Sequence, residues 1–172
     1  MLEEDCTPER MGYVVSGAGW AKLSFRADAD AEPMVFAVSY LHDSLGDLAR
    51  MGVELVKGAQ SATAVFMDEP GEVQLVVNGR KGNKDDKDDL SFELRGYPDW
   101  ASWDMTSADN YKVLASGVVR RADLVRNIHA ILERIYVDLG LVRYRELWVE
   151  HDFPLRAYEV LVAAFKKRPQ AF

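Results

Sequence analysis

The feature that most constrains the fold is a change of hydrophobic period at about residue 120. Before it, short segments such as "WAKLSFRA" (20–27) and "LSFELR" (90–95) alternate apolar and polar side chains, which is typical of half-buried strands. After it, apolar residues recur at helical spacing, as in Leu124, Ile128 and Ile131. The expected strands therefore come mostly first and are joined by short links, and the expected helices come mostly last. This order predicts an α+β fold with an antiparallel sheet.

The expected strands are 20–27, 34–39, 62–67, 73–79, 90–95 and 111–119. The segment "DEPGE" (68–72) separates two of them and predicts a hairpin, with Pro70 and Gly71 at the centre of a type II turn. The charged connection 79–89 is expected to be an exposed, mobile turn. We therefore expect a sheet of about five to six strands.

Helices are expected at about 40–57, with Ser39 as N-cap and Gly58 as the stop, and at 121–139. A shorter helical piece is expected at 142–150. The stretch "HDFPLRAYEVLVAAF" that follows has Asp152 as a candidate N-cap and Pro154 in the first turn. The predicted architecture is two long helices and a short one on one face of the sheet, in a single domain of 172 residues with a flexible segment at 1–11.

Charge and composition narrow the class of protein. The net charge of −7 disfavours nucleic-acid binding, which needs a basic surface. Residues 1–110 hold 10 Lys and Arg against 21 Asp and Glu, and residues 111–172 hold 11 against 7; this asymmetry either steers a charged partner or draws the two parts of the fold together. The single cysteine, Cys6, and the lack of a signal peptide or a long apolar run predict a cytoplasmic protein without a membrane segment.

The adjacent His42, Asp43 and Ser44 have the side-chain types of a nucleophilic triad. On the helix expected at 40–57 these side chains point about 100° apart and do not converge, so adjacency is no sign of catalysis. If the protein is instead a small enzyme or ligand-binding protein, His42, Glu69 and His151 are the acid/base candidates.

Metal motifs are not met. An EF-hand loop counted from Asp28 would have Pro33 where glycine is needed and Ser39 where glutamate is needed. The three histidines lie at no zinc-ligand spacing to one another or to the cysteine. The sequence predicts neither a metal nor another cofactor.

The segment "GYPDWASWDMTSADN" (96–110) is the least ordinary part of the chain, because it joins two expected strands with 15 residues. It carries Tyr97, Trp100 and Trp103, with Asp99 and Asp104 among them. Tryptophan and tyrosine are common anchors at protein interfaces, and the aspartates would favour a basic partner. The other interpretation is that the loop folds back and its aromatic side chains cover the core.

Three stretches, "YLHDSLGDLARMGVELVKGA", "DEPGEV" and "YRELWVEHDFP", resemble a group of small bacterial cytosolic proteins, some of which look like immunity proteins of toxin systems. The resemblance implies a small stand-alone domain and brings no catalytic residues. Together with the aromatic loop, it favours a non-enzymatic protein that binds a protein partner, of immunity or regulatory type.

Overall fold

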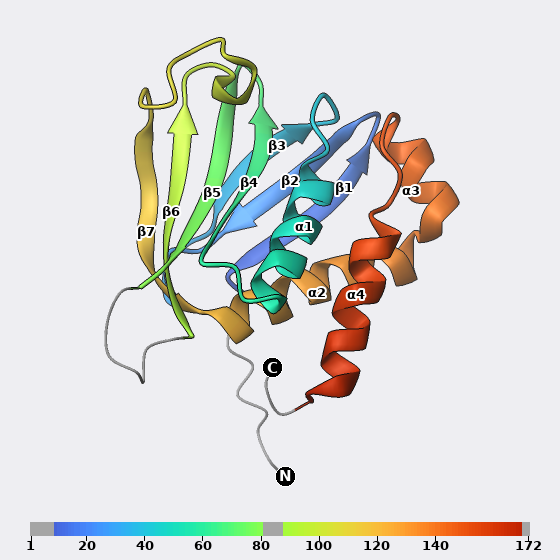
Figure 1. Cartoon of the computed structure of the whole chain (residues 1–172). Coiled ribbons are helices and arrows are strands. Elements are labelled where there is room, and N and C mark those ends of the chain that lie inside the picture. The colour runs from blue at the N-terminus through green and yellow to red at the C-terminus, as the bar shows by residue number, and fades with distance from the viewer. Residues whose placement is uncertain (1–8, 81–87, 170–172) are drawn as a thin grey trace.

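The computed structural model describes residues 9–80 and 88–169. These residues form two antiparallel sheets, of three and four strands, and four helices (Figure 1). The α+β class and the antiparallel pairing are confirmed, but the prediction of one sheet of five to six strands with three helices is wrong. The expected flexible segment 1–11 and mobile turn 79–89 lie mostly outside the described residues, as does Cys6. Met11, in contrast, is buried and begins the first strand.

Sheet A consists of β1 (Met11–Gly17), β2 (Trp20–Phe25) and β3 (Met34–Ser39) in that order. β1 was not among the strands expected from the sequence. Three successive residues with positive φ, Gly17, Ala18 and Gly19, turn the chain from β1 into β2. The backbone N–H of Gly19 donates to the carbonyl of Leu147, and this hydrogen bond connects the turn to the C-terminal half of the chain.

Sheet B follows in sequence order, with β4 (Ser61–Asp68), β5 (Gly71–Gly79), β6 (Asp89–Tyr97) and β7 (Lys112–Arg120). The predicted hairpin between β4 and β5 is present, because Asp68 pairs with Gly71. Its central residues are Glu69 and Pro70, joined by a cis peptide bond, so the prediction of a type II turn centred on Pro70 and Gly71 is wrong.

The first helix, α1 (Ser44–Val56), begins later than predicted, because its N-cap is Asp43 and not Ser39. The Asp43 carboxylate accepts a hydrogen bond from the Gly46 N–H at 3.0 Å. Gly58 has a φ of 88° just beyond the C-cap, as the stop signal predicts.

The last three helices are α2 (Arg121–Asp138), α3 (Gly140–Trp148) and α4 (Leu155–Lys167). Gly140, with a φ of 69°, turns the chain between α2 and α3. The N-cap of α4 is Pro154 and not the predicted Asp152, whose carboxylate instead accepts from Arg145 at 2.7 Å.

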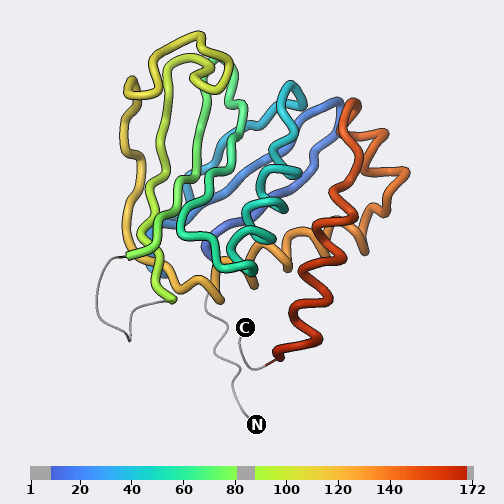
Figure 2. The backbone as a smooth tube through the Cα atoms, in the orientation of Figure 1, coloured from blue at the N-terminus to red at the C-terminus, as the bar shows by residue number. Residues whose placement is uncertain are grey.

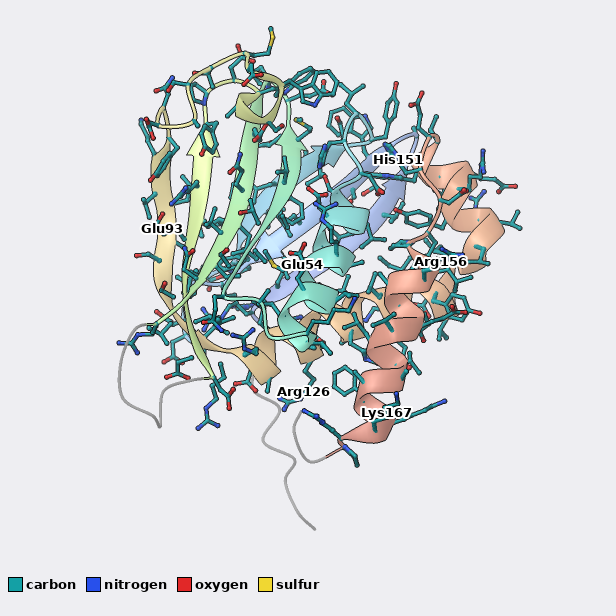
Figure 3. The ribbon with its side chains drawn as sticks, in the orientation of Figure 1. Glu54, Glu93, Arg126, His151, Arg156 and Lys167 are labelled. Carbon is teal, nitrogen blue, oxygen red and sulfur yellow. The ribbon has the colours of Figure 1, made fainter. Side chains whose placement is uncertain are left out.

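The inner faces of both sheets are buried in one core together with the helices. Figure 2 shows the path of the chain through the two sheets and the helices. The rings of Phe25 in sheet A and Phe92 in sheet B meet edge to face at 5.5 Å. Gly52 lets α1 approach the side chains of Ile128 on α2 and Leu161 on α4, since a Cβ there would lie 3.1 and 3.2 Å from them. The opposite face of sheet B carries polar residues such as Glu93, which Figure 3 shows on the side away from the helices.

Two side chains satisfy the backbone of border strands. The Asn127 amide on α2 accepts from the Met11 N–H at 2.9 Å and donates to the Met11 carbonyl at 2.8 Å, as a neighbouring strand would. The Asp47 carboxylate on α1 accepts from the Val65 N–H of β4 at 3.2 Å. Buried strand edges need partners of this kind.

Candidate functional site

The loop between β6 and β7 folds over one end of the outer face of sheet B. Val73, Leu75 and Val77 of β5 point into the core, so the alternation of the strand places Glu72 on the outer face. Glu72 is nevertheless only 1% exposed. The short 3-10 helix η2 (Ala101–Trp103) provides the cover, since Ser102 binds the Glu72 carboxylate.

The Glu72–Ser102 contact fixes the loop to the sheet. The Ser102 N–H donates to the two carboxylate oxygens at 3.1 and 3.3 Å, and the Ser102 hydroxyl donates at 2.7 Å. The Gln74 amide, two residues along the same strand, donates at 2.5 Å. Hydrogen bonds to a carboxylate are shorter and stronger than those between neutral groups, so the loop holds a defined position on β5.

A second set of contacts holds the other end of the loop. The Tyr97 hydroxyl donates to the Ala108 carbonyl at 3.0 Å, and its ring lies 5.5 Å from that of Tyr111. The Arg95 guanidinium stacks over Tyr111 at 4.3 Å. Burial raises the pKa of Tyr97. The positive charge of Arg95 acts in the opposite direction but does not outweigh burial, so the Tyr97 hydroxyl remains a hydrogen-bond donor at neutral pH.

The two loop tryptophans have different environments. Their rings meet edge to face with centroids 5.0 Å apart. Trp100 is partly buried, but Trp103 is 49% exposed and the following Met105 is 63% exposed. Tyr97 and Trp100 therefore fold back on the sheet, and Trp103 faces solvent.

The loop aspartates shape the backbone around these rings. The Asp99 carboxylate accepts from the Trp100 N–H at 2.8 Å. Asp104 has a φ of 57° and ends η2, with its side chain exposed. This left-handed residue turns the chain so that Met105 follows Trp103 at the surface.

His42 lies before α1 and not on it, so the helical geometry expected for it is wrong. Its Nε2 atom is 2.7 Å from the Asp47 carboxylate and not paired with Asp43 or Ser44. Asp47 also accepts from Arg50 at 2.5 Å and from the Val65 N–H. Burial raises the pKa of Asp47, but the hydrogen bonds and charges of His42 and Arg50 outweigh it, so this pKa lies below its ordinary value. The cluster connects α1 to β4.

The other acid/base candidates lie in separate environments. His151, in the α3–α4 connection (Figure 3), has its Nε2 atom 3.0 Å from the Tyr40 carbonyl. Glu69 is exposed at the tip of the β4–β5 hairpin. No hydrogen bond or ion pair joins any two of His42, Glu69 and His151. Within residues 9–80 and 88–169, no group of three or more His, Cys, Asp and Glu is arranged to hold a metal ion.

The role of Glu72 was not predicted from the sequence. The available signal was a carboxylate next to the apolar run of β5. Comparisons with protein-family models, curated proteins and solved structures found no match to this chain. No helix in the described part of the chain is both long and apolar enough to cross a bilayer.

Proposed function

We propose that the protein is a non-enzymatic module, of immunity or regulatory type, that binds a protein partner through the 96–110 loop. One observation carries this proposal: the buried Glu72 fixes the loop to the sheet, while Trp103 and Met105 project from it into solvent. Two large apolar side chains exposed together on an ordered loop are more informative than a single exposed apolar residue.

The fixed position of the loop favours binding. A segment that is already ordered loses little conformational entropy when a partner docks. Tryptophan supplies a large contact area, and methionine adapts its shape to the opposing surface. The nearby Asp99, Asp104 and Asp109 favour basic groups on the partner next to these two side chains.

The proposal is tested by comparing proteins captured from the native host by three chains: the unchanged protein, the double variant Trp103→Ala with Met105→Ala, and the control Val142→Ala. Val142 is 75% exposed on α3, outside the loop. We expect the unchanged chain and the control to capture a host protein that the double variant does not capture. The same host protein, once purified, should bind the unchanged chain in calorimetry. Equal capture by all three chains would exclude the loop as the binding surface.

A further inference from the structure

The border strands of the two sheets differ in how they are covered. The edge of β1 packs against α2 and α3 and has the Asn127 contact. β3 and β4 lie against each other, and Asp47 satisfies part of the β4 backbone. β7 is the remaining border strand, and Figure 2 shows it along the outside of the molecule.

β7 is unusually open for a strand of its length. Seven of its nine residues are exposed. Among the described residues, no side chain donates to or accepts from its backbone. Val113, Leu114 and Val118 are exposed at 50%, 39% and 45%. A long border strand with apolar side chains is a template for pairing with a further strand.

The charges of β7 select the kind of strand that it can pair with. Lys112 and Arg120 stand at its two ends, and neither has an ion pair among the described residues. In an antiparallel pair of two copies of β7 centred on Ser116, Lys112 would face Arg120, and like charges directly opposite destabilise a pair. A partner strand with an apolar middle and acidic ends avoids this repulsion and matches both cations.

A cavity of about 440 Å³ opens beside the C-terminal end of β7. Val118 and Arg120 line it together with Arg10, Asp28 and Asp123. Asp123 is paired with Arg126 at 2.9 Å, and the Arg10 guanidinium donates to backbone carbonyls of Arg26 and Ala27. Glu9 also lines the cavity and pairs with Arg134 at 3.2 Å. Arg120 is the lining arginine whose side chain has no hydrogen bond or ion pair among the described residues, so it can meet an incoming carboxylate.

From these features we infer that β7 accepts an added strand from a different protein, an extended segment with an apolar middle and a carboxylate that enters the cavity beside Arg120. Backbone hydrogen bonds along β7 would give affinity, and the cavity would select the acidic side chain, as in other cases of strand addition. This surface is separate from the 96–110 loop and does not depend on the function proposed for it.

The test selects peptides from a displayed random library against the full chain and measures their affinities by fluorescence anisotropy. We expect the selected peptides to be apolar with an acidic end. Val118→Glu, which places a carboxylate on the strand border next to the acidic end of the peptide, should weaken them by about tenfold or more, and Val142→Glu should not. Arg120→Gln should weaken only the peptides that carry the acidic end. Circular dichroism checks that each variant is folded.

Methylation of alternate peptide nitrogens separates strand addition from side-chain docking, because it removes backbone donors and keeps the side chains. Loss of binding on methylation supports the proposal. Three results would overturn it: binding that tolerates methylation or Val118→Glu, a library that yields no binder, or a dimer of the protein that dissociates when Val118→Glu is introduced. Trp103→Ala should leave the selected peptides bound, so failure here and failure of the loop proposal are distinguishable.

Discussion

Replacing Glu72 with alanine removes the acceptor that fixes the 96–110 loop to β5. The Ser102 N–H and hydroxyl and the Gln74 amide all lose their partner. The matched control is Glu69→Ala, three residues away at the hairpin tip, where the carboxylate is exposed.

The magnitude follows from the hydrogen bonds and their surroundings. A hydrogen bond to a charged group contributes about 1.5–3 kcal/mol. Ser102 donates to the Glu72 carboxylate with both its backbone N–H and its hydroxyl. Two effects reduce the sum: the variant no longer buries a charge, and Ser102 is exposed enough for water to replace the lost acceptor. We expect the free energy of opening the loop to fall by roughly 2–4 kcal/mol for Glu72→Ala, and by less than about 0.5 kcal/mol for Glu69→Ala.

Amide hydrogen exchange of residues 100–105, measured beside a urea titration of the whole chain, checks this prediction. The Ser102 amide should exchange faster in Glu72→Ala, while the amides of the central strands keep their protection because the inner core is unchanged. If exchange in the loop is the same in both variants, the Glu72–Ser102 contact does not hold the loop, and the loop is not a fixed binding surface.

Three further outcomes are expected. The pKa of Asp47 lies below its ordinary value in the folded chain. The contribution of Asp47 to the free energy of unfolding is therefore present above about pH 4 and is lost as the pH falls through the folded pKa. Urea titrations at falling pH should show a shrinking difference in stability between the unchanged chain and Asp47→Asn. Leu132→Ala, in the core, should cost about 2–5 kcal/mol, and Val137→Ala, exposed on the same helix, less than about 0.5 kcal/mol; equal costs would contradict the packing of α2. Trp103→Phe should remove more of the acrylamide-quenchable fluorescence than Trp100→Phe does, and the reverse order would contradict the exposure of Trp103.

The sequence predicts the strands and helices of this fold better than their arrangement. β3 begins and ends at the predicted residues, and β2 and α2 differ from prediction by one or two residues at an end. Alternation shows that a strand has a buried face but not which strand lies beside it. The division into two sheets therefore could not be read from the pattern. The helix predicted between 34–39 and 62–67 is present as α1, but its presence does not determine whether β3 and β4 pair.

The candidate site shows the same limit. The length and aromatic content of the 96–110 loop marked it as unusual, but whether it extends or folds back depends on the Glu72–Ser102 contact, across a separation of 30 residues. His42 gives a second example. Its partner Asp47 became available because the helix begins at Ser44, and a shift of a few residues in a helix start is beyond what residue spacing defines.

The Asn127 contact has a consequence for folding during synthesis. It joins Met11 to a residue 116 positions further along, and the β1–β2 turn is fastened to Leu147. Sheet B pairs only strands that follow one another and can assemble as they leave the ribosome. The border of β1 stays open until α2 and α3 have been synthesised, because proteins emerge from the N-terminus. A chain stopped before residue 127 would carry β1 as an uncovered border strand, so we expect such fragments to aggregate rather than to fold in part.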